Sequence, residues 1–236
     1  MPRWLSLSFQ DFRSISILYL VDLHNFAIII ILRVLILISY ILLYTIFSYY
    51  FYKGFSEGTF IETIWSLVPA VLLIFLVIPS MKSLYSMEDW HEGPIFTFKV
   101  VAHQWYWTYI SPIFYLSGGG LSESIFFKLS QDSTLLIDRP LRLLDCDESL
   151  SIPYGGSRRF LISSTDVIHS FAVPSMGLKI DAVPGRINQL FARPTRLGVF
   201  FGQCSEICGS NHSFMPIKLE VLSPLDFIEF HKTVNM

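Results

Sequence analysis

A short stretch near the C-terminal end, residues 203–216, gathers side chains that bind soft metal ions. Its donors are two thiols, an imidazole and a thioether, supplied by Cys204, Cys208, His212 and Met215. Thiolate and thioether sulfur select copper, and imidazole also binds it, so this set suits copper better than other common metals. A blue-copper site would use one Cys, two His and a weak Met. Because two Cys are present, we expect their sulfurs to bridge a pair of copper ions.

Two simpler interpretations of the same stretch do not account for all of it. Cys204 and Cys208 could form a disulfide, or they could be half of a zinc site. Neither alternative uses Met215, and zinc would require a fourth nitrogen or sulfur donor. Cys146 lies far from the pair in the sequence, and we expect it to be a free thiol.

A copper pair needs one more terminal ligand, and the remaining histidines are the candidates. They are His24, His91, His103, His169 and His231. His169 stands directly after a predicted strand, whereas His24 falls at a membrane edge and His231 in a terminal helix. We favour His169 and keep His103 and His91 as alternatives.

The composition divides the chain into an apolar first third and a more polar remainder. Over its 236 residues, 52% are hydrophobic, 15% are charged and the formal net charge is −2. A chain of this charge gives no sign of binding nucleic acid. The apolar residues concentrate near the N-terminus, which predicts membrane segments followed by a separate globular part.

Two apolar runs in the first third predict a membrane hairpin of two transmembrane helices. The first covers about residues 25–52 with Arg33 as its one charge, and the second covers about residues 61–81. Each is long enough to cross a hydrocarbon core of about 30 Å. Arg33 could extend its side chain to the interface or pair with a partner subunit. We therefore assign residues 1–24 to an N-terminal segment and residues 25–82 to the hairpin.

Two features outside the metal stretch could also carry chemistry. Glu62 begins the second apolar helix, where the helix dipole stabilises a carboxylate, although a carboxylate at a membrane edge could also take up protons. The run His103-Gln104-Trp105-Tyr106-Trp107 forms an aromatic cluster at the end of a predicted strand. These rings could be ordinary packing, or an exposed aromatic could pass electrons toward the metal.

The remaining residues, 83–236, predict an all-β domain with a short C-terminal helix. Alternating apolar and polar residues predict strands at 95–102, 159–163, 189–192, 198–201 and 217–221. Short strands separated by turn signals favour a sandwich or barrel. We expect residues 117–138 to form a long surface loop, and Ser223 to cap a helix running to about Lys232. The metal stretch is then a loop whose ends are held by strands.

From about residue 57 onward, the sequence resembles subunit 2 of the aa3-type cytochrome c oxidases, a family of haem–copper oxidases. The blocks that carry the resemblance are residues 62–65, 103–107, 166–170, 177–179, 181–186 and 204–215. The resemblance implies that the β domain is cupredoxin-like. It also implies a full ligand set for two copper ions: Cys204 and Cys208 as bridges, His169 with Met215 on one ion, and His212 with the backbone carbonyl of Glu206 on the other.

The resemblance also implies a function. The chain would accept electrons from reduced cytochrome c at the copper pair, with Trp105 as the point where they enter, and pass them to haem in subunit 1. Oxygen would be reduced to water there, with proton pumping, and Glu62 would stand at the mouth of a proton pathway. The Glu206 side chain would help to bind a magnesium ion shared with subunit 1.

Partners and location follow from the same resemblance. The expected partners are subunit 1, the other oxidase subunits, cytochrome c and the lipid bilayer. Since no signal peptide is recognisable and Lys is scarce, we expect a multi-pass protein of the mitochondrial inner membrane. Its copper domain would lie in the intermembrane space, and the alternative location is a bacterial plasma membrane.

Three departures from the family pattern concern the surroundings of the site. Phe201 stands where the family usually has Tyr, residues 108–112 lack a usual acidic residue, and residues 117–138 match poorly. Cytochrome c is basic and is steered by acidic residues. Asp166 is one acidic residue that could steer cytochrome c. Further candidates are Asp132, Asp138, Asp145, Asp147 and Glu148, although these could also form an ordinary solvated surface.

A membrane-anchored Sco-type copper chaperone is the main alternative, because it also has Cys-x-x-x-Cys and a distant His. Such a chaperone would have one span, a thioredoxin-like pattern around its cysteines, and no counterpart of His212 and Met215. Nitrous oxide reductase shares the copper motif in a much longer chain, and a quinol oxidase subunit lacks the copper ligands. We therefore expect an electron-transfer subunit of an oxidase.

Overall fold

The computed structural model describes residues 8–50, 57–88, 96–117, 120–138 and 140–234, together with Leu5 and Gly54. The chain falls into two compact units. One comprises residues 19–87 and contains most of two long helices. The other comprises residues 1–18 and 88–236 and contains the described strands. The metal stretch therefore belongs to the second unit.

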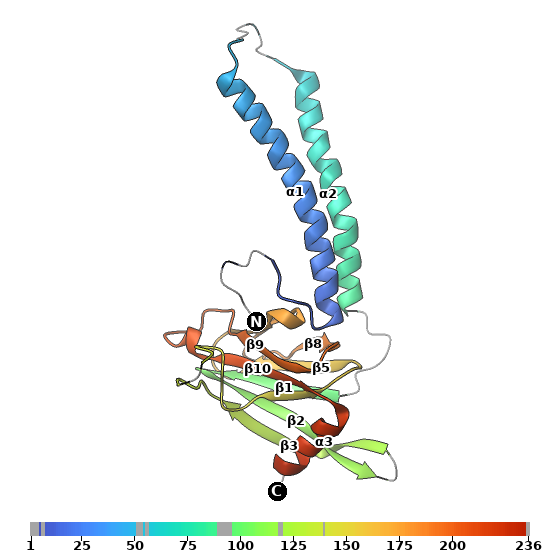
Figure 1. The fold of residues 1–236 in the computed structure, drawn as a ribbon, viewed down its shortest axis with the longest axis vertical. Helices are drawn as coiled ribbons and strands as arrows, with labels where there is room; N and C mark the ends of the chain where they lie inside the picture. The colour runs from blue at the N-terminus through green and yellow to red at the C-terminus, as the bar shows by residue number, and fades with distance from the viewer. Residues whose placement is uncertain are drawn as a thin grey trace. The chain divides into compact units, whose positions relative to one another are not determined.

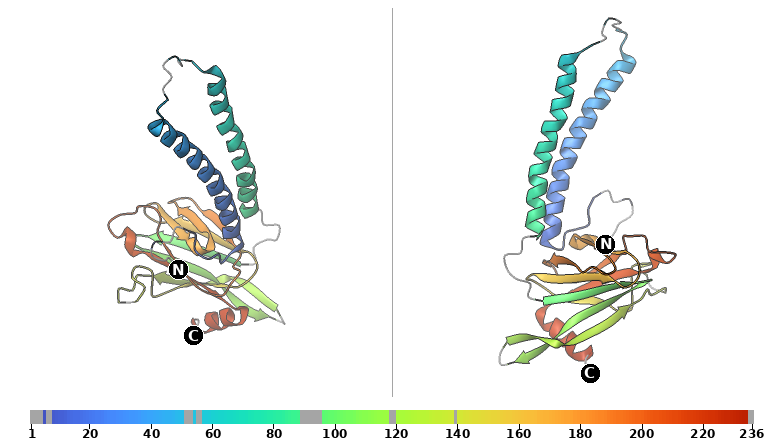
Figure 2. Two further views of the ribbon diagram at one scale, coloured as in Figure 1. Left: turned by 45° about the horizontal axis from the view of Figure 1, so that its top comes forward. Right: turned by 180° about the vertical axis from the view of Figure 1, so that it is seen from behind.

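The two long helices form a hairpin (Figures 1 and 2). They are α1, Ile15–Phe47, and α2, Thr59–Glu88, and each is long and apolar enough to cross a membrane. Most of their large apolar side chains are exposed. Exposing such a surface to water costs free energy, whereas exposing it to the hydrocarbon core of a bilayer does not. The predicted pair of membrane helices is therefore confirmed.

The helix boundaries differ from the predicted ones. Helix α1 begins at Ile15 rather than near residue 25 because Ser14 caps it, accepting a hydrogen bond from the backbone N–H of Ile17 at 3.5 Å. Helix α1 also ends before residue 52, and α2 continues beyond residue 81. Asp22 in α1 and Lys82 in α2 interrupt the apolar runs, so the runs begin after the first charge and end before the second although both helices continue through them.

Residues 1–24 are not one separate segment, because the chain before α1 is bound to the β domain. The backbone N–H of Arg13 donates to the carbonyl of Ser175 at 3.0 Å. Ile17 is fully buried and lies against Gly177, where a Cβ would come within 3.0 Å of the Ile17 backbone. Glycine at this position, with φ of +65°, thus lets the start of α1 pack closely on the domain.

The β domain contains two larger sheets and a two-stranded ladder (Figure 1). The five-stranded sheet has the order β3-β2-β1-β5-β8, in which only β1 and β5 are parallel. Its strands are β1 (Phe96–His103), β2 (Tyr106–Ser117), β3 (Gly120–Ser133), β5 (Arg158–Ser164) and β8 (Asn188–Ala192). The three-stranded sheet has the order β4-β10-β9, and β6 pairs with β7. These strands are β4 (Leu150–Pro153), β6 (His169–Val173), β7 (Leu178–Ala182), β9 (Gly198–Gln203) and β10 (Pro216–Leu222).

The core forms from the inward-facing residues of these strands. Every second residue of β1 is buried between Phe98 and Ala102, and β5 and β10 alternate in the same way. The rings of Phe98 and Phe160 stack with their centroids 5.8 Å apart. Burying one such side chain contributes about 2–3 kcal/mol, so the sheets form a stable support for the loops at their ends.

Five strands were predicted to within about two residues, but the predicted surface loop at 117–138 is wrong. Most of that range is strand β3, which pairs with β2 through a register shift after Pro112. Its Ser-rich sequence lacks a regular alternation, so its pairing partner is what makes it a strand. The terminal helix α3, Pro224–Val234, is confirmed, and Ser223 caps it by accepting from the backbone N–H of Asp226 at 3.2 Å.

Candidate metal centre

The metal stretch forms the connection between two antiparallel neighbours, β9 and β10. It leaves β9 after Gln203 and enters β10 at Pro216, so the sheet fixes both of its ends. A 3-10 helix, η2, spans His212–Phe214 within it. The loop thus presents four candidate donors at one end of the sheet: Cys204, Cys208, His212 and Met215.

Strand β6 brings His169 to this loop. The backbone N–H of Ser205 donates to the carbonyl of Ser170 at 3.1 Å. Gly202 passes so close to β6 that a Cβ there would lie 1.9 Å from the carbonyl oxygen of Ala172. Only glycine allows this approach. The close packing of β9 on β6 therefore places His169, the first residue of β6, beside the cysteines.

Cys204 lies at the centre of the first half of the donor set. A ring nitrogen of His169 and the sulfurs of Cys204 and Cys208 lie within 4.8 Å of one another, the one such group found among the described residues. The Sγ of Cys204 lies 3.9 Å from His169 Nδ1 and 3.3 Å from the carbonyl oxygen of Glu206. All three grouped residues are buried, so few water molecules can compete for them.

Cys208 lies at the centre of the second half. Its Sγ lies 3.5 Å from Nδ1 of His212 and 3.5 Å from Sδ of Met215. A tetrahedral metal ion with bonds of about 2.3 Å to sulfur and about 2.0 Å to nitrogen holds such donors about 3.5 Å apart. The spacing and the sulfur-rich chemistry of the donors therefore fit soft metal ions.

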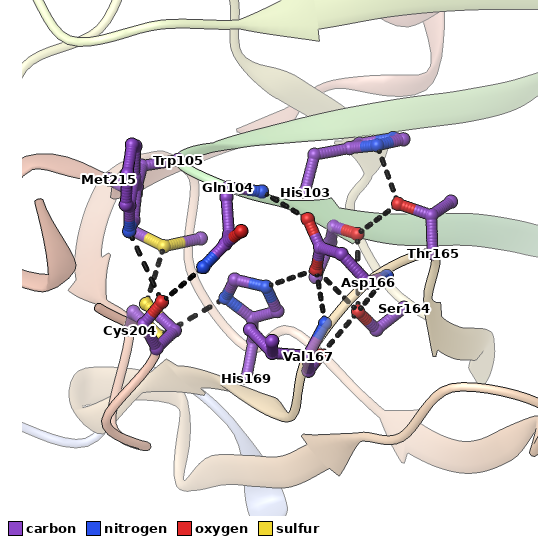
Figure 3. Close-up of polar contacts among 12 residues, drawn as sticks. His103, Gln104, Trp105, Ser164, Thr165, Asp166, Val167, His169, Cys204 and Met215 are labelled. Carbon is purple, nitrogen blue, oxygen red and sulfur yellow. Dashed lines mark hydrogen bonds and ion pairs between the residues drawn. The ribbon is translucent and has the colours of Figure 1, made fainter. Parts of the chain in front are cut away.

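Asp166 holds the ring of His169 on the side away from Cys204 (Figure 3). Its Oδ1 lies 2.9 Å from His169 Nε2, so the ring can donate from Nε2 and direct Nδ1 toward the thiol. Burial opposes ionisation, but hydrogen bonds from His169 and from the backbone N–H groups of Val167 and Gln104 lower the pKa of Asp166 to about 2. The carboxylate thus orients the imidazole. Burial favours the neutral ring, but hydrogen bonds to Cys204 and Asp166 raise the pKa of His169 above its usual value. A metal would bind the neutral form of the ring and release any proton held there.

The two cysteines do not lose their protons equally. Burial opposes both thiolates, but hydrogen bonding to His169 lowers the pKa of Cys204 below its usual value. Burial, and then the negative charge of Cys204, raise the pKa of Cys208. Two adjacent thiolates repel each other, and a metal cation would remove that repulsion. Both residues are free thiols, so the disulfide alternative is not what the structure shows.

The turn between β1 and β2 covers the loop. The side-chain amide of Gln104 and the indole N–H of Trp105 both donate to the carbonyl oxygen of Cys208, at 2.8 and 3.3 Å. Gly209 lies against this turn, with φ of +125°, and a Cβ there would stand 3.1 Å from Cζ2 of Trp105. Trp105 is therefore in direct contact with the chain that carries the cysteines.

The other candidates from the sequence lie apart from this cluster. His103 stacks on Tyr106 with ring centroids 4.6 Å apart, and its Nδ1 faces Thr165 at 2.9 Å. His91 lies outside the described residues. Glu62 lies in the first turn of α2, in the other unit. Of the alternatives for the missing ligand, the structure thus brings His169 to the cysteines.

Three supporting side chains were not predicted in that role: Gln104, Trp107 and Asp166. From the sequence alone, Asp166 is expected only to be a surface charge for docking. Its position three residues before His169 was a usable signal, since a histidine ligand commonly donates its second N–H to a carboxylate. Gln104 and Trp107 lie within two residues of Trp105 in the sequence, but only the fold shows that each contacts the loop of residues 203–216.

The fold and the donor set define a class: membrane-anchored proteins with a cupredoxin-like β domain and a soft-metal centre. Two family models match the chain. One is described as "Cytochrome C oxidase subunit II, periplasmic domain" and covers residues 96–222, and the other as "Cytochrome C oxidase subunit II, transmembrane domain" and covers residues 2–83. The chain belongs to this family, cytochrome c oxidase subunit II.

Individual relatives agree. Cytochrome c oxidase subunit 2 of Periplaneta americana is 38% identical over 100% of both chains. That of Oenothera berteroana is 38% identical over 94% of this chain and 87% of its own. The solved periplasmic domain of subunit II from Bradyrhizobium japonicum is 35% identical, with a TM-score of 0.54 over 61% of this chain and 96% of its own. A second structure holds subunit II in a mixed disulfide with a thioredoxin-like protein, with a TM-score of 0.51, 35% identity, and 62% and 95% coverage.

Family membership confirms the predicted fold class and function. The chain is an electron-transfer subunit of cytochrome c oxidase, a membrane complex of the respiratory chain, and other oxidase subunits are its partners. Its His169–Cys204–Cys208 group is compatible with a binuclear copper site. None of the relatives described above supports the copper-chaperone alternative.

Proposed function

We propose that the chain holds two copper ions bridged by Cys204 and Cys208, as the centre where the oxidase first accepts electrons. The observation that carries this proposal is that each sulfur has two further donors beside it. Cys204 adjoins His169 and the carbonyl of Glu206, whereas Cys208 adjoins Met215 and His212. Each implied terminal pair, His169 with Met215 and His212 with the Glu206 carbonyl, thus has one member at each sulfur, as expected if each ion touches both sulfurs.

The protein's contribution is to fix these donors in place. A copper pair bound there would accept and release one electron at a time. The ends of the loop are held by β9 and β10, and Asp166 fixes the ring of His169. Donors held in this way move little when the charge at the site changes, so little free energy goes into rearranging them. The carbonyl of Glu206 and the thioether of Met215 are weak donors, which adjust the reduction potential.

We propose Trp105 as the residue through which electrons enter from cytochrome c. The support is its indole N–H, which donates to the carbonyl of Cys208 and so joins a half-exposed ring to the metal loop. Val167 and Ile168 are exposed beside Asp166, whose backbone-bound carboxylate contacts the same turn. An apolar centre with acidic groups near it suits a basic protein partner.

Replacing Trp105 by Phe tests this role. The variant loses the N–H that joins the ring to Cys208, so reduction of the oxidase by cytochrome c in a single turnover should slow by about tenfold or more. Binding of cytochrome c should change much less, because most of the apolar ring remains. The control is Tyr106→Phe, the neighbouring half-buried ring. Equal losses in the two variants, or a loss confined to binding, would contradict the assignment.

We also propose roles for two carboxylates. The side chain of Glu206 is partly exposed next to its metal-facing carbonyl, and Mg²⁺ is usually held by one or two carboxylates with water and groups from a partner. It would therefore help bind a magnesium ion at the contact with subunit 1. Glu62 is exposed in the first turn of α2, where it could take up protons at the membrane edge for a pathway in subunit 1.

We place the hairpin of α1 and α2 in the lipid of the mitochondrial inner membrane and the β domain in the intermembrane space. The attachment of Arg13 to Ser175 supports this topology, since it puts the start of α1 on the same side of the bilayer as the β domain. Two spans require that arrangement. The mitochondrial location draws its support from insect and plant relatives, with a bacterial plasma membrane as the alternative.

A further inference from the structure

We propose that Trp107 is a positioning residue that holds His169 and Met215 in place together, an inference that rests on the copper centre proposed above. Trp107 lies in β2, in the five-stranded sheet, and its side chain is fully buried. His169 belongs to β6, and Met215 directly precedes β10. No element of regular structure therefore carries both donors, whereas the indole of Trp107 contacts both.

The first contact fixes the backbone of Met215. The indole Nε1–H of Trp107 donates to the carbonyl oxygen of Met215 at 3.3 Å, and both residues are buried. Met215 lies between η2 and β10, and the ladder of β10 with β9 begins one residue later, at Pro216. The hydrogen bond from Trp107 thus anchors the residue just outside the ladder, where the thioether leaves the chain.

The second contact confines the ring of His169. The rings of Trp107 and His169 meet edge to face, with centroids 6.0 Å apart and an interplanar angle of 63°. The ring of Phe171 also packs edge to face against the indole, with centroids 5.5 Å apart and an interplanar angle of 84°. Asp166 already fixes the ring of His169 through Nε2. With Trp107 against it as well, the imidazole cannot tilt without disturbing the same indole that holds Met215.

This linkage has a consequence for the strength of the thioether donor. A thioether bonds weakly to copper, and the axial ligand tunes the reduction potential of such centres. Loss of the anchoring hydrogen bond would let Met215 withdraw while the strongly bound cysteines stayed in place. The structure therefore gives Trp107 control over the binding strength and potential of the centre without making it a ligand.

Trp107→Phe tests the inference, because it keeps an aromatic edge near His169 and removes the N–H. In the assembled oxidase, we expect copper loss to a chelator to become at least about tenfold faster, the range typical of outer partners of metal ligands. The reduction potential of the copper centre should also shift. The matched control is Phe98→Leu, which loosens the same core but lies against Phe160 and Phe227 rather than the donors.

The outcomes separate the inference from the centre on which it rests. In one outcome, Met215→Leu alters the copper spectrum, whereas Trp107→Phe has the same rate of copper loss and the same reduction potential as the unaltered protein. Only the role of Trp107 is then overturned. If Met215→Leu also leaves the spectrum unchanged, the proposed ligand set fails. If Trp107→Phe does not fold, a measurement on the unaltered chain still tests the inference. The indole N–H proton of Trp107 should exchange slowly with solvent, and its resonance should shift on copper binding. A rapidly exchanging, unshifted resonance would overturn the inference.

Discussion

At the scale of single residues, hydrogen bonds determine which ring nitrogen of His169 faces the cysteines. His169 can bind through Nδ1 because Asp166 accepts from Nε2, and Asp166 is itself held by backbone N–H groups. Because these contacts already orient the imidazole, the ring need not rearrange when a metal binds. The candidate donors are thus oriented by residues outside the proposed ligand set.

Replacing Asp166 by Asn should weaken copper binding by about 10–100-fold, because an amide neither carries the negative charge nor selects one form of the His169 ring. Competition with a chelator measures the affinity directly. The matched control is Asp132→Asn, another carboxylate of the β domain, which accepts a hydrogen bond from Thr108 and has no contact with His169. Similar affinities for the two variants would show that Asp166 does not support the centre.

The sequence predicted the donors far better than it predicted their supports. Cys204, Cys208, His212 and Met215 stand close together in one loop, so their spacing alone indicated a metal site. His169 was one of several possible histidines, because its approach depends on the packing of β6 against β9. The contact of Trp107 with Met215 joins residues 108 positions apart, and no local pattern records it.

At the scale of elements, the metal loop depends on close approaches that only glycine permits. Gly202 lets β9 lie against β6, and Gly209 lets the loop pass beneath Trp105. Both contacts are backbone requirements, so they constrain the position of the loop whether or not metal is bound. Loops held in this way on a rigid sheet are well suited to keeping ligands fixed.

Gly209→Ala should therefore disturb the centre as well as the backbone. The added Cβ would press on Trp105, and the residue has φ of +125°, so we expect a cost of about 1–3 kcal/mol in stability and faster release of copper. Thermal unfolding and chelator kinetics measure the two effects. Gly155→Ala is the control, because Gly155 also has positive φ, at +72°, but nothing lies within 4 Å of its Cβ position. Equal copper release from both variants would refute the contact.

Helix α3 should give the β domain a pH-dependent stability. Burial lowers the pKa of His231 to about 4, and its ring packs against Phe227 with centroids 4.4 Å apart. The native state therefore keeps His231 neutral, whereas the unfolded chain protonates it near pH 6.5. Its contribution is complete above that pH and falls by about 1.4 kcal/mol per pH unit down to about pH 4. His231→Leu should flatten the measured unfolding free energy over this window, and an unchanged slope would contradict the assignment.

Strands with clear alternation, such as β1, β5 and β10, could be predicted because one face of each is buried. Strands β4 and β6 are buried throughout, so they show no alternation to detect. Strand β3 depends on its pairing with β2. The order of the strands, which brings β6 to the metal loop, comes from long-range packing that periodicity does not encode.

At the scale of the whole molecule, the chain combines a folded β domain with two helices whose apolar surfaces are unfavourable in water. The exposed apolar side chains of α1 and α2 require lipid or partner subunits, as family membership in the oxidase implies. The β domain carries the His169–Cys204–Cys208 group, which is compatible with a binuclear copper site.

The presence of two equivalent copper ions is tested most directly by electron paramagnetic resonance on the copper-loaded full-length chain, together with its copper content. We predict two copper ions per chain and a hyperfine pattern from two equivalent nuclei sharing one unpaired electron, which Cys204→Ser or Cys208→Ser should abolish. A single copper ion per chain, with a spectrum from one nucleus, would contradict the account.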